Sequence, residues 1–303
     1  MTTALNKLRV LDMSRILAGP WAGQLLGDYG ADVVKVERPG NGDDTRQWGP
    51  PWLGSESAYF LCANRNKRSL TIDIATASGQ QVIRELAGTA DVLLENFKVG
   101  TLKRYELDPD DLLAANPRLI ICSISAFGQS GTRAAQPGYD AMIQASGGLM
   151  SITGPADAEG GGPQKVGVAI ADIMAGMYAT TAILAALHAR EKTGRGQHID
   201  VPLYDSQVAW LANQSMNFLV SGAVPGRMGT AHPNLGPYQA FPTSDGNLML
   251  AVGNDHQFAA CVECLGRGEL AQDDRYATNK ARISNRVPLI DIFRNCLQQH
   301  TTG

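Results

Sequence analysis

Short apolar runs alternate with amphipathic stretches through much of this 303-residue chain. Runs with strand character cover residues 8–13, 31–37, 70–74, 91–96 and 119–125. Helical patterns follow them at 20–30, 76–88 and 108–115. Strands that alternate with helices predict an α/β layer fold with a parallel sheet. The nearly continuous apolar character of the strands indicates that both faces of the sheet are covered.

A second pattern begins after residue 150. The run of small and apolar residues over 166–187 predicts a long helix over 171–190, and a strand-like stretch follows it. Residues 222–237 are rich in Gly and Pro, as linkers are. Beyond them, Asp245-Gly246 predicts a β-hairpin, and helical patterns at 255–265 and 278–299 complete a small α+β module. We therefore expect a large domain at 1–221, a linker at 222–237 and a small domain at 238–303.

One charged residue interrupts the run 166–187. Asp172 is its only Asp, Glu, Lys or Arg, and a carboxylate there is costly to bury unless it is paired or used. Its place near a helix start lets backbone N–H groups and the helix dipole hold it as an anion. Asp172 could cap the helix or serve as a functional carboxylate, because both roles fit this position. The residues of this run alone do not decide between the two roles.

Composition narrows the function classes. A net charge of −3 gives no basis for binding nucleic acid or an anionic membrane, and 44% apolar residues are ordinary for a globular protein. The five cysteines are too few and too scattered for a disulfide scaffold. The first residues enter a strand pattern with no room for a signal or transit peptide, so we expect a cytoplasmic protein. Asp172 argues against a membrane span at 166–187.

The loop after the first predicted strand, SRILAGPWAG, opens a helix but lacks the GxGxxG spacing of a dinucleotide site. We expect basic residues at or beyond the carboxyl ends of the strands, where open α/β sheets bind ligands: Arg15, Arg38, Lys67, Arg68 and Arg104. Several cations at one edge suit a polyphosphate, and Glu95-Asn96-Phe97 adds an amide and a ring. The sequence shows no Ser-His-Asp array and no metal-ligand spacing, so we expect no metal.

Several of these segments resemble one family, the class III CoA-transferases, which include formyl-CoA:oxalate and carnitine CoA-transferases. The matching segments are LDMSRILAGPWAGQLLGDYGADVVKVERPGNGDDTR, NRNKRSLTID, ADVLLENFKVGTLKRY, NPRLIICSISAFGQSG, and the stretch from Asp172 through GRGQHIDVPLYDS. They cover nearly the whole chain in the family's order. The stretch GRMGTAHPNLGPYQAFPTSDGNLMLAVGNDHQF is most similar to the succinyl-CoA:glutarate (dicarboxylate) branch.

The resemblance implies an enzyme that moves CoA from a succinyl-CoA-like donor to a dicarboxylate such as glutarate. Asp172 would be the nucleophile and would carry an aspartyl-CoA thioester, with CoA or acyl-CoA as substrate and no permanently bound cofactor. The family's CoA contacts fall on Ile16, Arg38, Ile72, Asn96, Phe97, Arg104 and Tyr139. We place selectivity for the acid at Arg15 and His232.

The α-methylacyl-CoA racemases of the same superfamily are an alternative, since they too resemble the chain at Asp172. They use a His in a GHD motif, which here reads Gly138-Tyr139-Asp140. Returning a proton to carbon needs a second acid/base group, and Tyr139, with an ordinary pKa of about 10, is a poor replacement. Leu17 and Pro137 stand where formyl-CoA transferase has glutamine and lysine, which argues against oxalate or formate. A non-catalytic CoA-binding fragment is a further alternative.

The resemblance also implies a fold and an assembly. The large domain would be a Rossmann-like open parallel sheet, joined to the small α+β domain, in ring-shaped subunits that interlock as a homodimer. In the family a C-terminal segment returns to the large domain, and we expect that segment to be absent here, which puts ring closure in question. The expected partners are therefore an acyl-CoA, a carboxylic acid and a second copy of the chain.

Overall fold

The computed structural model describes residues 3–303 and divides into two compact units. The first unit contains the residues up to Leu149 together with Lys165–Ala212, and the second contains Met150–Gln164 and Asn213–Gly303. The second unit thus takes in a segment, 150–164, that lies far from 238–303 in the sequence. The domain boundaries expected from the sequence stay a prediction.

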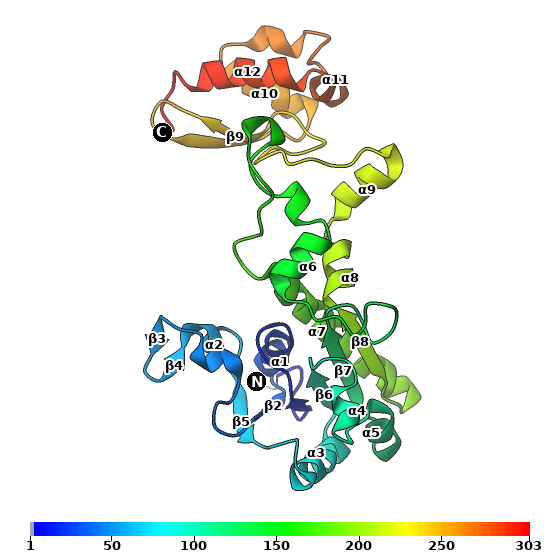
Figure 1. The fold of residues 1–303 in the computed structure, drawn as a ribbon. Coiled ribbons are helices and arrows are strands. Elements are labelled where there is room, and N and C mark those ends of the chain that lie inside the picture. The colour runs from blue at the N-terminus through cyan, green and yellow to red at the C-terminus, as the bar shows by residue number, and fades with distance from the viewer. Residues whose placement is uncertain (1–2) are drawn as a thin grey trace. The chain divides into compact units, whose positions relative to one another are not determined.

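A six-stranded, all-parallel sheet forms the centre of the first unit (Figure 1). Its order is β5-β2-β1-β6-β7-β8, and every neighbouring pair runs parallel. The strands are β1 (Arg9–Asp12), β2 (Asp32–Glu37), β5 (Lys67–Thr71), β6 (Val92–Glu95), β7 (Ile120–Ser125) and β8 (His198–Pro202). The strand order reverses between β1 and β6, and in open α/β sheets ligands bind at the carboxyl ends of such a pair.

Helices cover both faces of this sheet, as its apolar strands predict. Helices α1 (Ala18–Asp28) and α7 (Ile170–Thr193) pack on one face, and α3 (Ala77–Thr89), α4 (Thr101–Arg104) and α5 (Pro109–Ala115) on the other. Along β1, Val10 joins the core under α1 and α7, whereas Leu11 joins the core under α3 to α5. This alternation is the period of two that a strand imposes, and it confirms the α/β fold.

Helix α7 is long and apolar enough to cross a membrane by length and composition alone. Four of its alanines, however, form a buried stripe that packs on the sheet and against α1: Ala171, Ala175, Ala179 and Ala186. Gly176 permits the close approach of the two helices, because a Cβ there would lie 2.6 Å from the carbonyl oxygen of Ala18. The helix is therefore part of the core of the first unit.

Short elements complete the first unit around the carboxyl edge of the sheet. They are the 3₁₀ turn η1 (Asp44–Gln47), β3 (Trp52–Leu53), β4 (Glu56–Ser57), α2 (Ala58–Cys62), α6 (Asp140–Ser146) and α8 (Leu203–Ala209). β3 and β4 pair as a small antiparallel hairpin. The Ser57 hydroxyl accepts the Phe60 N–H at 3.0 Å and so caps α2 at its N-terminus.

The second unit has its own core around a two-stranded antiparallel hairpin. The hairpin, β9 (Tyr238–Pro242) and β10 (Asn247–Ala251), turns at the Asp245-Gly246 pair, as the sequence predicts. Phe241, Phe258 and Phe293 fill the core between it and α10 (Asp255–Cys264), α11 (Asn279–Ser284) and α12 (Arg286–Leu297). Helix α9 (Ala212–Ser221) precedes them, and 3₁₀ turns lie at Met150–Ile152, Asp157–Glu159 and Gly268–Ala271. The single helix expected over 278–299 is two helices, which break at Asn285.

Two basic residues are not where the sequence pattern puts them. Lys67 and Arg68 begin β5, at the amino end of that strand, and not at a carboxyl end. The Lys67 ammonium is buried against Asp12 at 2.9 Å, whereas Arg68 forms an exposed ion pair with Asp32. The expected strand 70–74 was placed too late, because the charged start of β5 does not look like a strand.

Candidate active site

The loop after β1 is held in place by buried charges. Asp12, fully buried, accepts the backbone N–H of Ser14 at 3.0 Å and pairs with Lys67. The buried ammonium of Lys35 donates to the Ser14 carbonyl at 2.8 Å and pairs with Asp43 at 2.9 Å. Burying charges is costly unless they are paired and hydrogen-bonded, so these groups fix the loop that leads into α1.

Ile16 in this loop has a φ of 71°, which is rare for a β-branched residue. Its N–H points at Asp43, whose two carboxylate oxygens each lie 3.3 Å away. Such a conformation costs of order 1–3 kcal/mol and persists only where the surroundings hold it. The Asp43 carboxylate supplies that support, and it places residues 15–17 at the edge of the sheet.

A second loop, after β6, meets the first across the strand-order reversal. The Asn96 amide oxygen accepts the Arg15 N–H at 2.8 Å, and its amide nitrogen donates to the Arg15 carbonyl at 2.7 Å. The Arg15 guanidinium lies 5.3 Å from the centre of the Phe97 ring. Asn96 and Phe97 therefore fix the backbone and the side chain of Arg15 together.

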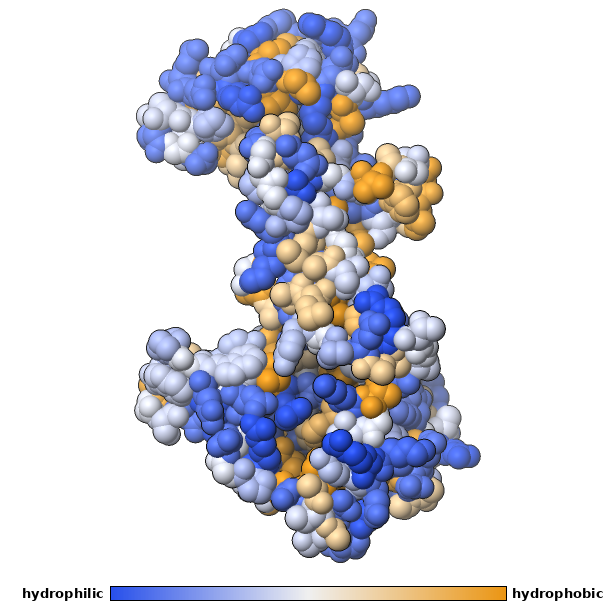
Figure 2. Space-filling view, viewed as in Figure 1, coloured by the Kyte–Doolittle hydropathy of each residue, from blue (hydrophilic) through white to orange (hydrophobic). Residues whose placement is uncertain are grey.

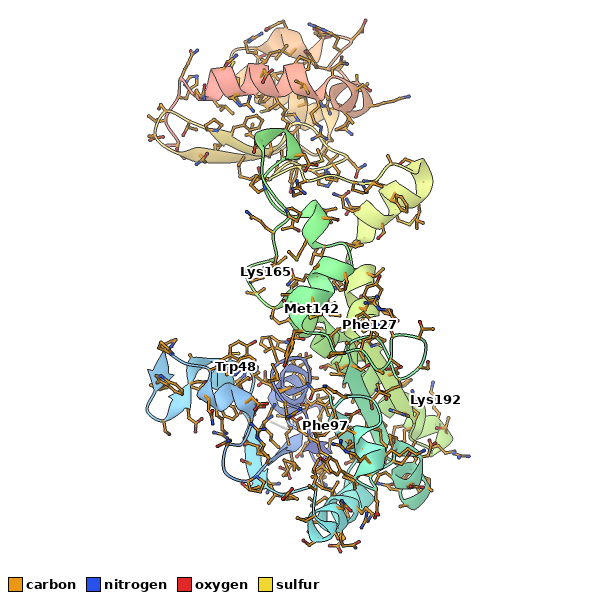
Figure 3. All side chains as sticks on the ribbon, in the orientation of Figure 1. Trp48, Phe97, Phe127, Met142, Lys165 and Lys192 are labelled. Carbon is orange, nitrogen blue, oxygen red and sulfur yellow. The ribbon has the colours of Figure 1, made fainter. Side chains whose placement is uncertain are left out.

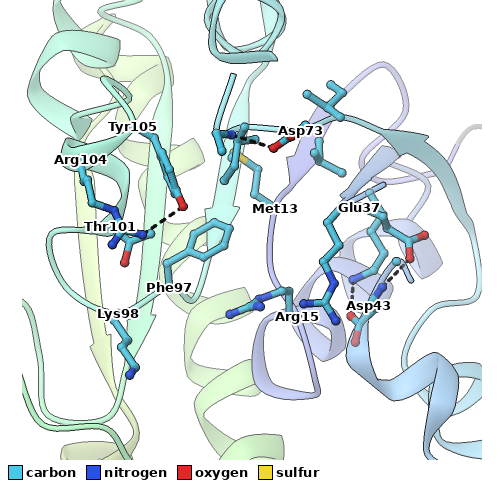
Figure 4. A pocket seen from close by; sticks show the side chains of 17 residues that line it. Met13, Arg15, Glu37, Asp43, Asp73, Phe97, Lys98, Thr101, Arg104 and Tyr105 are labelled. Atoms are coloured by element: carbon cyan, nitrogen blue, oxygen red, sulfur yellow. Dashed lines mark hydrogen bonds and ion pairs between the residues drawn. The ribbon is translucent and has the colours of Figure 1, made fainter. Parts of the chain in front are cut away.

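Two cavities lie where these loops meet. The first, of about 380 Å³, contains Arg15, Arg38, Ile72, Phe97 and Arg104 in its lining (Figure 4). The second, of about 400 Å³, is lined by Arg15, Asp172 and, among the expected CoA contacts, Ile16, Asn96, Phe97 and Tyr139. Every CoA contact expected from the sequence thus lines one cavity or the other. Arg15, Phe97 and Lys98 line both.

Asp172 stands in the first turn of α7, as the sequence predicts, and its side chain is partly buried. Burial, and then the negative charge of Asp140, raise its pKa to about 7. The carboxyl group is thus poorly solvated, lines a cavity, and becomes the anion that a nucleophile needs as the pH rises above about 7. No described side chain donates a hydrogen bond to it among the interactions of residues 3–303.

Asp140, at the start of α6, caps α7 from outside the helix. Its Oδ1 accepts the Ala171 N–H at 2.7 Å and the Asp172 N–H at 3.4 Å. Its Oδ2 accepts from the Gln144 amide at 2.7 Å, and the Gln144 oxygen accepts the Val166 N–H at 2.9 Å. Asp140 was not among the residues that we selected from the sequence, because its partner helix begins thirty residues later.

Tyr59 is a second residue that the sequence did not single out. Burial, and next the charge of Asp172, raise its pKa to about 12, so the phenol keeps its proton at neutral pH. The ring stacks edge-on with Trp48, with 5.0 Å between the ring centres. Trp48 and Phe97 belong to two different segments of the first unit (Figure 3). Trp48 directly follows η1, and Phe97 lies in the turn after β6. Tyr59 is thus a neutral hydrogen-bond donor within electrostatic reach of Asp172.

His232 belongs to the second unit. Its Nδ1 accepts the Asn234 N–H at 3.0 Å, and its ring centre lies 5.2 Å from that of Tyr238. Its role in acid selectivity stays a prediction. Tyr139, where a racemase has histidine, is exposed, and no group of three His, Cys, Asp or Glu suited to a metal occurs among residues 3–303.

The model of CoA-transferase family III matches residues 5–303. The chain belongs to CoA-transferase family III. It is 52% identical to the succinate–glutarate CoA-transferase of Agrobacterium fabrum, over 95% of this chain and 73% of that one. It is 45% identical to the human succinyl-CoA:glutarate CoA-transferase, over 99% of this chain and 68% of that one.

Solved structures agree with this membership. A CAIB/BAIF family protein from Brucella suis superposes with a TM-score of 0.85 at 50% identity, over 99% of this chain and 80% of that one. A protein from Mycobacterium tuberculosis superposes with a TM-score of 0.88 at 34% identity, over 99% and 79% of the two chains. This family III CoA-transferase therefore acts on CoA thioesters, and the two cavities are the place in the first unit to look for them.

Proposed function

We propose that this CoA-transferase moves CoA from succinyl-CoA, or a similar dicarboxylic acyl-CoA, to a dicarboxylate such as glutarate, with Asp172 as the nucleophile. The observation that carries the proposal is the partly buried carboxylate of Asp172 in the wall of a cavity that shares Arg15, Phe97 and Lys98 with a second, cation-lined cavity. The names of the relatives from Agrobacterium fabrum and man support the choice of acids.

The reaction requires two anhydrides and one thioester on Asp172. A carboxylate oxygen of Asp172 attacks the thioester carbon, the C–S bond breaks, and a mixed anhydride and the CoA thiolate form. The thiolate attacks the Asp172 carbonyl carbon, which releases the donor acid and leaves an aspartyl-CoA thioester. The acceptor carboxylate then attacks the aspartyl-CoA thioester, which releases the CoA thiolate and forms a second mixed anhydride. The thiolate attacks the acyl carbon of the acceptor in this anhydride, and the acceptor leaves as its CoA thioester. Electrons and protons balance, and the Asp172 carboxylate is restored.

The first cavity suits the nucleotide end of CoA. Arg38 and Arg104 line it together with Arg15 and Lys98, and guanidinium groups bind phosphates with paired hydrogen bonds. Ile72 and Phe97 add apolar and aromatic surface. The thioester would then lie toward the second cavity and Asp172.

Arg15 is the side chain best placed to bind the second carboxylate of a dicarboxylic acid. It lines the cavity of Asp172, and its Nε is buried with no hydrogen-bond partner. Its ion pair with Asp44 is long, at 3.6 Å, because Asp44 lies closer to Arg38. Apolar neighbours, Leu17 and Leu203 among them, suit the methylene chain between the two carboxylates.

A homodimer, with the interlocked rings of the family, is part of the same proposal. Met177, Tyr178 and Leu184 leave one face of α7 apolar and more than a third exposed. Leu219 and Val220 of α9 are 71% and 81% exposed, and the region of α9 presents hydrophobic surface in the space-filling view (Figure 2). Apolar surface of this kind marks protein contacts, and a second copy is its expected occupant. Light scattering after gel filtration tests it, and a monomer at micromolar concentration would contradict it.

The test of the nucleophile is a trapping experiment. The protein is mixed with succinyl-CoA, quenched with borohydride or hydroxylamine, and its intact and peptide masses are measured. We expect a modification on the peptide that carries Asp172 and none in Asp172→Ala. An unmodified Asp172 in a protein that binds CoA and transfers it would overturn the mechanism.

A further inference from the structure

A third cavity, of about 260 Å³, lies behind the turn that follows β6. Phe97 and Lys98 line it as well as the first two cavities. The turn at residues 97–98 therefore borders the two proposed substrate cavities and the third cavity as well. Among the residues that line this third cavity are Glu95 and His198, and neither has a part in the proposed chemistry.

Glu95 supports this turn from within the core. The residue is 4% exposed and ends β6. Its Oε2 accepts the Phe97 N–H at 2.8 Å, which closes the turn around Asn96. Asn96 in turn holds both backbone groups of Arg15. A change in the Glu95–Phe97 hydrogen bond would thus reach Arg15 as well as the cavity wall.

A chain of hydrogen bonds leads from Glu95 to the third cavity. Glu95 and Ser123 are opposite each other in the register of β6 and β7, and the Ser123 hydroxyl, as a donor toward the carboxylate, lowers the pKa of Glu95. The same oxygen lies 2.8 Å from Nε2 of His198 on β8. Because a hydroxyl has one proton, it donates to an ionised Glu95 and accepts from His198, or accepts from a protonated Glu95 and donates to His198. The chain is therefore able to exist in two proton arrangements.

The charge of Glu95 has no cationic partner within ion-pair distance among residues 3–303. Burial above all raises the pKa of Glu95 to about 7, Asp200 adds to this, and the bonds from Ser123 and Phe97 oppose it. Burial likewise lowers the pKa of His198. The titratable groups around Glu95 are His198, Asp200, the thiol of Cys122, and, across the third cavity, Lys98, Lys103, Asp108 and Asp110.

We propose that Glu95 is a positioning residue for CoA: ionised, it holds the turn at 97–98 through the Phe97 N–H, and the Ser123–His198 chain lets it exchange its proton at the third cavity. A charged acceptor makes a stronger hydrogen bond than a neutral one, so protonation of Glu95 loosens the turn and weakens CoA binding. The inference rests on the proposed function only in placing CoA against this turn.

The test measures CoA binding at pH 6 and pH 8 by calorimetry in an Asp172→Asn background, which removes the titration of Asp172. We expect the dissociation constant of CoA to be about fivefold larger at pH 6. Glu95→Gln keeps the shape but lacks the charge, so its dissociation constant at pH 8 should match the value of the background protein at pH 6 and change less with pH. Any change that remains in Glu95→Gln comes from groups other than Glu95, the phosphates of CoA among them.

Asp110→Asn is the matched control, because it removes an exposed carboxylate from the same cavity without touching the turn. It should keep the full pH dependence. Ser123→Ala removes a bond that favours the ionised form and should move the midpoint to higher pH.

Equal pH dependence in Glu95→Gln and in the background protein would overturn the inference while CoA transfer stands. If the wild-type protein does not transfer CoA from succinyl-CoA to glutarate but still binds CoA in a pH-dependent way, the proposed function is overturned. The inference about Glu95 then stays in place.

Discussion

Asp140 and Asp172 are two carboxylates tied through one backbone N–H. Oδ1 of Asp140 accepts the N–H of Asp172 at 3.4 Å and that of Ala171 at 2.7 Å. After burial, its charge is the second cause that raises the pKa of Asp172. One residue thus fixes the start of the helix that carries the proposed nucleophile and also makes that nucleophile more basic.

Asp140→Asn separates these two effects. The amide oxygen still accepts the Ala171 N–H, but the negative charge is gone, so the pKa of Asp172 should fall below its present value of about 7. Because transfer needs the ionised form of Asp172, the acid limb of kcat/KM should move to lower pH. A pH–rate profile from pH 5 to 9 measures this. Asp140→Ala, which also loses the cap, should lose about 1 kcal/mol of stability in addition. An unmoved acid limb in Asp140→Asn would show that its charge does not reach Asp172.

Asp172→Asn should abolish transfer and stabilise the protein at pH 8. Between pH 3.8 and about 7 the folded protein keeps a proton on Asp172 that the unfolded chain has lost. Stability therefore falls as the pH rises through this window, and above it the ionised carboxylate costs up to about 4 kcal/mol. Urea unfolding should show a gain for Asp172→Asn at pH 8 that disappears near pH 4.

Asp205→Asn is the control for this comparison. Asp205 is also an acid in the first turn of a helix, α8, but it is exposed. Its replacement should change the free energy of unfolding by less than about 0.5 kcal/mol at pH 8. A loss of stability in Asp172→Asn at pH 8 would contradict the raised pKa.

The local pattern of the sequence was enough to predict most strands of the sheet and the place of Asp172 in the first turn of a helix. β1, β2, β6 and β7 lie in short, β-branched and largely apolar runs between turn signals, and such runs are typical of buried strands. Asp172 stands out because a lone acid in an apolar helix is rare. The start of β5 escaped prediction, since Lys67 is buried only because Asp12, far away in sequence, pairs with it.

The supporting residues of the site could not be read in the same way. His198 is exposed, as a polar residue of this kind suggests, but only the register of β7 and β8 shows that its Nε2 lies 2.8 Å from the Ser123 hydroxyl. Asp140 and Tyr59 come near Asp172 from two other helices, α6 and α2, so their roles depend on tertiary packing. The Gly138-Tyr139-Asp140 motif was noticed for its missing histidine, whereas its aspartate is the residue that contacts α7.

Arg15→Gln should impair the use of dicarboxylates selectively. Without the guanidinium, the second carboxylate of glutarate loses a charge-assisted hydrogen bond, and kcat/KM for glutarate should fall about 30-fold or more. Pentanoate, which has the same chain length and one carboxylate, should be affected less than threefold. Steady-state rates with both acceptors at a saturating donor concentration measure the difference.

Arg38→Gln is the matched control for Arg15. Arg38 lines the first cavity and not the second, so its loss should raise KM for the acyl-CoA and affect both acceptors equally. Equal losses for glutarate and pentanoate in Arg15→Gln would place Arg15 with the CoA phosphates instead.

Lys67→Met should destabilise the first unit strongly. Its ammonium lies 2.9 Å from Asp12, and the side chains are 2% and 0% exposed. Removing one partner leaves a buried charge uncompensated, which costs about 3–5 kcal/mol, and Asp12 also holds the loop of Ser14. Arg68→Met breaks the neighbouring but exposed pair with Asp32 and should cost less than about 1 kcal/mol. Urea unfolding of both variants compares the two pairs, and equal losses would mean that the Asp12–Lys67 pair is solvated and does not fix the loop.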